Sequence, residues 1–332
     1  IPIPESLGGA GMDTVAYAAT VMELARADAS VAITMAAHTS LGTMPIVIAG
    51  SEEQKKKFVP PLASGEMIGA FGLTEPDAGS DAGATKTTAV KKGDEYILNG
   101  GKIFITNVGE AGILNLTARV IEGDEDKGIG AFIIETNTPG LIINPKEKKM
   151  GWCASDTRQI FFEDMAIPAK NMLGTPGIGF KTFLKTLTGG RISIAALSVG
   201  TALGAYERAL KYAAERKAFG KVIHKFQAIG NKLADMATEI EAAKLLTFHA
   251  AWMNDQGLDI QKEAAMAKLF ASETAMRTTT EAIQIHGGYG YVKEYDVERY
   301  FRDAKILEIG EGTSEIQRLI ISKNIVNSVK AM

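Results

Sequence analysis

The order in which sequence patterns follow one another constrains the fold of this chain more than any single motif does. Residues 13–63 are rich in alanine, methionine and leucine, and the stretch MDTVAYAATVMELARADASVAITMAAHTSLG is apolar on nearly all sides, as in helices buried among other helices. From Met67 to about Gly174, short β-branched and aromatic runs such as EYILNGGKIFITN and RQIFFEDMAIP alternate with turn residues, which predicts a β-domain. Within it, Asn99-Gly100 is predicted to form a hairpin turn.

The chain returns to helical periodicity after the linker GTPGIGF, with long stretches at residues 191–216, 226–254 and 261–286 and a helix stop at Gly287-Gly288. Strands that are grouped rather than alternating with helices argue against a dinucleotide-binding sheet, and no GxGxxG follows a strand. We therefore predict an α+β fold with an N-terminal helical domain, a middle β-domain and a C-terminal helical domain. The predicted domains are residues 1–66, 67–175 and 176–332.

Composition and charge limit the classes of protein to which the chain can belong. Its 332 residues, 46% hydrophobic and 23% charged, are typical of a soluble globular protein, and we identify no apolar run long enough to span a bilayer. A formal net charge of −3 gives no support for a nucleic-acid partner. Cys153 is the single cysteine, so no internal disulfide can form, and we expect it to be a small packing residue. The histidines are scattered, and we predict no metal site.

The stretch FGLTEPDAGSDAGA, residues 71–84, has the composition of a loop that brings backbone amides close to a ligand. Unencumbered N–H groups and hydroxyls suit a flavin edge or a phosphate, although a simple polar turn has similar composition. In the following KIFITN, strand alternation predicts that Phe104 and Thr106 share one face and Ile103 and Ile105 the other. An aromatic ring and a hydroxyl would then share one surface.

The stretch EIGEGTSEIQR places the carboxylate of Glu311 between two glycines, directly before a predicted helix. Ser314 and Gln317 have the spacing of a capping box, in which the serine would cap the helix. Taken alone, Glu311 is explained by its favourable interaction with the positive end of the helix dipole. A catalytic carboxylate is the alternative.

These stretches together resemble the acyl-CoA dehydrogenase family, flavoenzymes that desaturate acyl-CoA thioesters. The motifs LTEPDAGSD, FITN, ERKAFGK with FQAI, QIHGGYGY and EGTSEIQR occur in family order over essentially the whole chain. The resemblance implies the fold already predicted, with a four-helix bundle in the C-terminal domain. The chain begins IPIPESLGGAGMD, without an initiator methionine, and we expect that roughly the first two helices of the family are absent and that the N-terminal domain is incomplete.

The resemblance assigns site residues to this chain. It implies contacts to FAD from Leu73, Thr74, Ser80, Phe104 and Thr106 in the β-domain. It further implies contacts to the FAD of a neighbouring subunit, where the fork of Arg216 suits the pyrophosphate. These residues are Arg216, Phe219, Gln227, Gln284, Gly287 and Gly288, while Thr313 and Glu315 would approach the adenine half. Without the resemblance, Arg216, Phe219 and Gln227 are explained as a solvated helix end. Ser80, Arg191 and Gly312 are assigned to the acyl-CoA substrate.

Glu311 falls on the catalytic base of the family, which removes the α-proton of the thioester while the β-carbon passes hydride to the flavin. A helix N-terminus favours ionisation by about 0.3–1 kcal/mol, whereas burial can raise a carboxyl pKa by roughly 3–5 units, so we expect burial to dominate when substrate is bound. The backbone N–H of Glu311 and a ribityl hydroxyl would receive the enolate charge. Some relatives carry the base directly before the arginine that corresponds to Arg191, but Gly190 has no side chain there.

The motifs most resemble short-chain, butyryl-type members, which implies that electrons pass to an electron-transfer flavoprotein. An acyl-CoA oxidase that uses dioxygen and a non-catalytic flavin- or CoA-binding subunit are the alternatives. Sites shared between subunits imply a homo-oligomer, as a rule a tetramer. We expect a cytoplasmic protein if the source is bacterial and a mitochondrial matrix protein if it is eukaryotic, and favour the former.

Overall fold

The computed structural model describes residues 1–330 of the chain. Two compact units can be distinguished, and each is described by itself. Unit 1 contains Ile1–Asp13, Thr34–Lys148 and Ser155–Gly190, and unit 2 contains Thr14–Ile33, Lys149–Ala154 and the chain from Arg191 onward. Helices, then strands, then helices follow one another along the chain, as the sequence predicts. The limits of the three domains stay a prediction.

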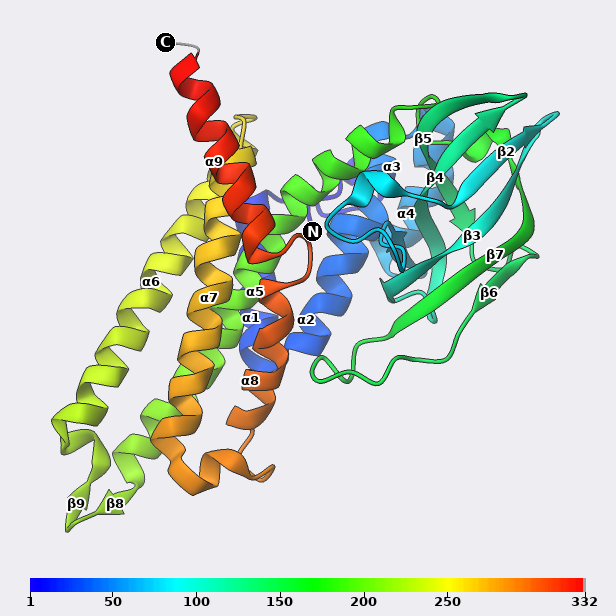
Figure 1. The fold of residues 1–332 in the computed structure, drawn as a ribbon. Helices are drawn as coiled ribbons and strands as arrows, with labels where there is room; N and C mark the ends of the chain where they lie inside the picture. Colours follow the sequence, from blue (N-terminus) through cyan, green and yellow to red (C-terminus); the bar gives the residue numbers. More distant parts are fainter. Residues whose placement is uncertain (331–332) are drawn as a thin grey trace. The chain divides into compact units, whose positions relative to one another are not determined.

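Unit 1 is built on a sheet with strand order β1-β4-β2-β3-β7-β6, in which β5 pairs with β4 (Figure 1). The β1–β4 and β2–β4 pairs are parallel and the remaining pairs are antiparallel. The strands are β1 (Ile68–Gly72), β2 (Thr88–Lys92), β3 (Glu95–Thr106), β4 (Ala111–Glu122), β5 (Glu125–Glu135), β6 (Leu141–Ile143) and β7 (Thr157–Pro168).

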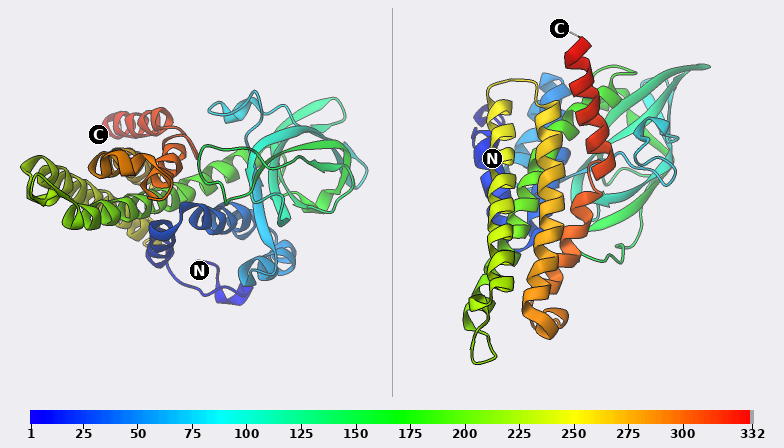
Figure 2. Two further views of the ribbon diagram at one scale, coloured as in Figure 1. Left: turned by 90° about the horizontal axis from the view of Figure 1, so that it is seen from below. Right: turned by 60° about the vertical axis from the view of Figure 1, so that its left-hand side comes forward.

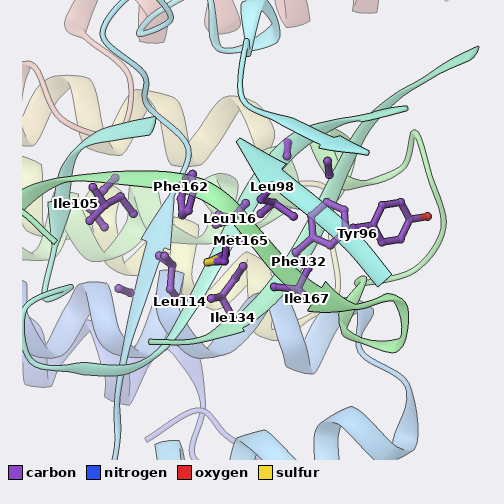
Figure 3. Close-up of a cluster of buried hydrophobic side chains, with 14 of the residues drawn as sticks. Tyr96, Leu98, Ile105, Leu114, Leu116, Phe132, Ile134, Phe162, Met165 and Ile167 are labelled. Atoms are coloured by element: carbon purple, nitrogen blue, oxygen red, sulfur yellow. The ribbon is translucent and has the colours of Figure 1, made fainter. Parts of the chain in front are cut away.

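The core of this sheet is a cluster of aliphatic and aromatic side chains (Figure 3). Leu98, Leu116 and Met165, from three different strands, are fully buried there. Tyr96 and Phe132 meet edge to face, with ring centroids 5.3 Å apart. Burial of such side chains is the main favourable term in folding, and it fixes the register of the strands because a one-residue slip would turn the apolar face outward.

The Asn99-Gly100 pair does not form the predicted hairpin turn. It lies inside the continuous strand β3, where the pairing with β7 shifts register between Leu98 and Gly100. The Asn99 side chain instead forms two hydrogen bonds with Asp164 of β7, at 3.0 and 2.9 Å. These contacts between distant residues outweigh the local turn preference, and the β2–β3 turn falls at Gly93-Asp94, just before β3 begins at Glu95.

Short helices complete unit 1, and a second apolar cluster joins them to the sheet. Ser51 and Gln54 form a capping box at the start of α4, and the Gln54 amide also donates to the Lys170 and Met172 carbonyls. Phe71 of β1 stacks on Phe183, with ring centroids 4.2 Å apart. The helical segments are η1 (Glu5–Leu7), the π-helix η2 (Ala37–Thr43), α3 (Met44–Ala49), α4 (Glu52–Ser64), η3 (Ala82–Ala84), η4 (Ala169–Asn171) and the first part of α5 (Gly179–Glu215).

Unit 2 is helical, and its antiparallel helices α6 and α7 lie alongside each other over most of their length (Figures 1 and 2). Asp255, the last residue of α6, accepts the Thr14 and Val15 backbone N–H groups at the start of α1. Gly200 of α5 allows a close approach to α1, because a Cβ there would lie 2.1 Å from the Met22 carbonyl oxygen. The elements are α1 (Thr14–Ala27), most of α2 (Ala29–Ala36), the rest of α5, β8 (Lys217–Ala218), β9 (Lys221–Val222), η5 (Ile223–Lys225), α6 (Gln227–Asp255), α7 (Gln261–His286), η6 (Gly287–Tyr291), α8 (Val297–Lys305), η7 (Ile306–Glu308) and α9 (Ser314–Lys330).

The helical segment Ala29–Ala49 is, by length and composition, long enough and apolar enough to cross a membrane, which the sequence analysis did not anticipate. In the structure 56% of its most apolar window is buried. A core helix of a soluble protein has the same length and composition, so the segment is weak support for a membrane span. The predicted helix stop is confirmed, because α7 ends at His286 and Gly287 has φ +60°.

Candidate functional site

The Glu311 turn lies between η7 and α9 in unit 2 and has an unusual backbone. Glu311 has φ +53° and Gly312 has φ +93°, both in the left-handed region. A residue with a Cβ rarely occupies this region and does so mainly where its surroundings hold it there, often at functional sites. The turn therefore depends on neighbouring side chains.

The predicted capping box at Ser314 and Gln317 is wrong. The helix begins at Ser314, and the hydroxyl of the preceding Thr313 accepts the Ile316 N–H at 3.3 Å, as an N-cap does. The Gln317 side chain is fully buried and donates instead to the Glu311 carbonyl at 3.2 Å and the Gly312 carbonyl at 2.8 Å. Gln317 therefore holds the turn rather than the helix end.

Lys268 of α7 reaches the same turn from another helix. Its side chain is fully buried, and its Nζ donates to the Gly312 carbonyl at 2.8 Å. This lysine was not predicted from the sequence. A signal was present, because Lys268 follows Ala264 and precedes Ala271 and Ala275 on the buried stripe of its helix.

The carboxyl group of Glu311 is electrostatically unusual. Residue 311 as a whole is partly exposed, but its Oε2 is inaccessible and has no hydrogen-bond partner among residues 1–330. Burial raises the pKa of Glu311 to about 7, against the opposing influence of Lys268 and Arg191. Burial likewise lowers the pKa of Lys268 to about 8 and that of Arg191 below its ordinary value. A carboxyl with a pKa near neutrality is suited to accept a proton.

The turn that carries Leu73 and Thr74 lies in unit 1, after β1, and is tied to β3. The Ile103 N–H donates to the Thr74 carbonyl at 2.9 Å, and the Lys102 ammonium donates to the Leu73 carbonyl at 3.1 Å. Lys102 also forms a buried ion pair with Glu75 at 2.7 Å. Sequence reasoning missed this pair, although a lysine within an apolar strand is a recognisable sign of a buried partner.

Phe104 lies on a bulge of β3 that interrupts the predicted alternation. The register with β7 shifts between Lys102 and Ile105, and Phe104 has φ +60°. Its side chain is 64% exposed, whereas Thr106 is half-buried. An exposed ring on a rigid strand is available for packing against a planar ligand. Ser80, on the loop before β2, is also exposed.

A pocket of about 550 Å³ in unit 2 contains three of the predicted cofactor residues. The Arg216 guanidinium lies over the Tyr289 ring, 5.4 Å from its centroid. A Cβ added at Gly287 or Gly288 would meet nothing within 4 Å, so a ligand can approach their backbone. An arginine beside accessible glycine backbone suits a phosphate group. The pocket is lined by Tyr212, Arg216, Ile223, Ile285, His286, Gly287, Gly288, Tyr289, Val292 and Glu294.

The other predicted cofactor residues of unit 2 lie outside this lining. Phe219 is 95% exposed on the β8–β9 turn, and its ring meets Phe226 edge to face with centroids 6.1 Å apart. Gln227, Gln284 and Glu315 are exposed, and Thr313 is half-buried. Because these side chains are exposed, they are available to contact a ligand or a second subunit.

Two further residues complete the comparison with the sequence. Cys153 is exposed, so the prediction that it is a small packing residue is wrong; it lies in a short turn. His286 is buried, stacks on Tyr212 and bonds to the Ala282 carbonyl at 2.7 Å. Within residues 1–330, no group of three or more His, Cys, Asp or Glu side chains could hold a metal ion.

Comparison with known proteins gives consistent matches over the chain. Three family models match: acyl-CoA dehydrogenase N-terminal domain at residues 1–66, middle domain at 70–165 and C-terminal domain at 177–326. A probable acyl-CoA dehydrogenase of Bacillus subtilis, YngJ, is 54% identical over 98% of this chain and 86% of its own. The structure of butyryl-CoA dehydrogenase from Megasphaera elsdenii has a TM-score of 0.95 and 48% identity, covering 98% of this chain and 86% of that one. A chain from a structure described as the electron transferring flavoprotein of Acidaminococcus fermentans has the same TM-score, identity and coverage.

Proposed function

The chain belongs to the acyl-CoA dehydrogenase family of FAD-dependent oxidoreductases, and we propose that it dehydrogenates the α,β-bond of a short-chain acyl-CoA to the trans-2-enoyl-CoA, with Glu311 as the base. One observation carries the assignment to Glu311. Its Oε2 is buried without a hydrogen-bond partner among the described residues, on a turn held by side chains of two helices. A structural carboxylate would be paired or solvated.

Glu311 would accept the α-proton of the thioester. A pKa of about 7 leaves about half of these carboxyls ionised at neutral pH, while making the carboxylate more basic than an exposed glutamate. Arg191 and Lys268, whose charges oppose the rise in this pKa, keep the ionised form accessible. The turn has a left-handed backbone at Glu311 and Gly312, and we assign the peptide N–H of Glu311 to the thioester carbonyl. Ser80, Arg191 and Gly312 remain the proposed substrate contacts.

FAD, the cofactor of the family, would supply the acceptor for the hydride that leaves the β-carbon. The exposed ring of Phe104 and the tethered Leu73–Thr74 turn fit the flavin, together with Thr106 and Ser80. The pocket with Arg216, Gly287 and Gly288 fits its pyrophosphate, and we assign Phe219, Gln227, Gln284, Thr313 and Glu315 to the rest of the cofactor. Because acyl-CoA dehydrogenases are typically tetrameric, we propose a homotetramer in which this pocket serves a neighbour.

An electron-transfer flavoprotein is the proposed electron acceptor. A structure described by that name contains a chain with 48% identity to this one, and the butyryl-CoA dehydrogenase structure is equally similar. Bacterial relatives support a cytoplasmic location. Use of dioxygen, as in an oxidase, is the competing proposal, and it is distinguished by the rate at which the reduced protein is reoxidised in air.

Anaerobic reduction of the holoenzyme by butyryl-CoA tests the proposed base. Glu311→Gln should keep FAD and bind the thioester but lose reductive bleaching by several orders of magnitude, since an amide cannot accept the proton. Glu241→Gln, on α6 and paired with Lys244 at 3.1 Å, is the control and should bleach like the wild type. Near-normal bleaching in Glu311→Gln would overturn the assignment.

A further inference from the structure

The Gly312 carbonyl receives two hydrogen bonds from side chains on two different helices. Lys268 of α7 and Gln317 of α9 both donate to it at 2.8 Å, and both are fully buried. Gly312 itself is closely enclosed, because a Cβ there would lie 2.8 Å from Gln317 Nε2. The Gly312–Thr313 peptide is therefore clamped by two helices. It directly follows Glu311, whose backbone conformation is rare for residues with a side chain.

Lys268 is an unfavourable choice for a residue whose role is only to hold a carbonyl. A buried ammonium group is destabilising, and Gln317 already satisfies the same oxygen. Several charged groups influence Lys268: Glu311, Glu308 and Glu315 favour its protonated form, and Arg191 of α5 opposes it. Of these acids, Glu311 has the largest influence, and none forms a hydrogen bond with Lys268 among the described residues. The hydrogen bond to the Gly312 carbonyl thus places the Lys268 charge at the residue directly after Glu311.

We propose that Lys268 is a positioning residue for Glu311: its ammonium group fixes the turn through the Gly312 carbonyl, and its charge favours the carboxylate form of Glu311 at neutral pH. The inference rests on the proposed role of Glu311 as base. A neutral hydrogen-bond donor at position 268 could hold the carbonyl but could not favour the carboxylate form of Glu311. Gln317 supplies the matched comparison, because it holds the same carbonyl without a charge.

The test compares Lys268→Met, Lys268→Gln and Gln317→Leu in the holoenzyme. An opposite charge nearby lowers a carboxyl pKa by about 1–3 units, so both Lys268 variants should move the rise of flavin reduction by butyryl-CoA to higher pH by about that amount. The rate at pH 7 should fall by about tenfold for each pH unit by which the profile moves, and it should recover at alkaline pH. Gln317→Leu should lower the rate at every pH without moving the profile. Lys262→Met, at the exposed start of α7, is the control and should leave the profile unchanged.

An infrared titration of the substrate-free protein gives a readout that does not depend on turnover. The carboxylic acid band that disappears in Glu311→Gln identifies Glu311, and its midpoint should move upward in both Lys268 variants. A rate loss that is equal at every pH, with an unmoved midpoint, would overturn the inference and leave Lys268 as a clamp alone. If Lys268→Met does not fold, Lys268→Gln decides the question. Failure of the proposed function is separate, because it would appear as an active Glu311→Gln.

Discussion

At the scale of single residues, the buried ion pair of Lys102 and Glu75 holds the turn that we propose to contact the flavin. Glu75 accepts the Lys86 and Thr87 backbone N–H groups at 2.7 and 3.1 Å, in addition to Lys102. Burial alone would raise the pKa of Glu75, but Lys102 and these hydrogen bonds hold it below its ordinary value. The Lys102 ammonium also donates to the Leu73 carbonyl, so the pair connects strand β3 to the turn that carries the proposed flavin contact.

Glu75→Gln should therefore destabilise the protein strongly. It leaves Lys102 as a buried charge without its counterion, a change that costs about 3–5 kcal/mol in the free energy of unfolding. The double variant with Lys102→Met removes that charge and should recover a large part of the loss. Asp77→Asn, which breaks the exposed pair with Lys86, is the control and should change stability little. Urea unfolding measures all three, and a Glu75→Gln protein as stable as the wild type would contradict the prediction.

At the scale of elements, the π-helix η2 is locked onto the sheet by backbone contact and by one histidine. Gly42 meets Gly69 so closely that a Cβ at Gly42 would lie 2.4 Å from the Gly69 carbonyl carbon. His38 Nδ1 accepts the Gly69 N–H at 2.9 Å, so Nε2 carries the proton that goes to the Leu62 carbonyl at 3.0 Å. This arrangement needs a neutral imidazole, and burial lowers the pKa of His38.

The stability that His38 contributes should depend on pH. Its pKa is lower in the folded protein than in the unfolded chain, where it is about 6.5, so the unfolded chain takes up the proton first as the pH falls. The contribution is therefore complete above about pH 6.5 and is lost as the pH falls through the folded pKa. Thermal melts of the wild type and His38→Gln between pH 8 and pH 5 should show a steeper loss in the wild type. Parallel curves would show that His38 does not titrate in this way.

Predictions from sequence succeeded where the signal was a pattern spread over many residues and failed where individual side-chain contacts decided the outcome. The order of helical and strand zones, the stop at Gly287 and the turn at Glu311 were predicted. The Asn99-Gly100 hairpin was wrong because Asp164, 65 residues away, pairs with Asn99. Gln317 was assigned to a capping box, but its amide turns toward the Gly312 carbonyl. No local pattern identifies Asp164 as the partner of Asn99, since the two residues lie on separate strands. The partner of Gln317 is close in sequence, but the cap position is taken by Thr313 and the glutamine amide is left to bind the turn.

At the scale of the whole molecule, the proposed site needs residues of two subunits. Glu311 would act on the substrate of its own subunit, whereas the pocket with Arg216 would bind part of a neighbour's FAD. The exposed position of Arg216 and the 95% exposed Phe219 agree with contacts beyond their own chain. A change at Arg216 should therefore disable the partner's site rather than its own.

Mixed oligomers can test whether Arg216 serves the site of a neighbouring subunit. Arg216→Ala and Glu311→Gln should each be nearly inactive as homo-oligomers, the first through weak FAD binding and the second through loss of the base. In a mixed pair, the site of the subunit with intact Glu311 also contains Arg216 from its neighbour and should be active. The other site lacks both Glu311 and Arg216 and should be inactive. Random pairing after co-expression then yields about a quarter of the wild-type activity, because half of the pairs are mixed and each has one working site.

Differently tagged subunits allow the mixed species to be purified, and its FAD content and butyryl-CoA reduction to be measured. Co-expressed Glu311→Gln and Glu241→Gln is the control for assembly. Absence of activity in purified mixed oligomers that retain FAD would show that Arg216 serves its own subunit.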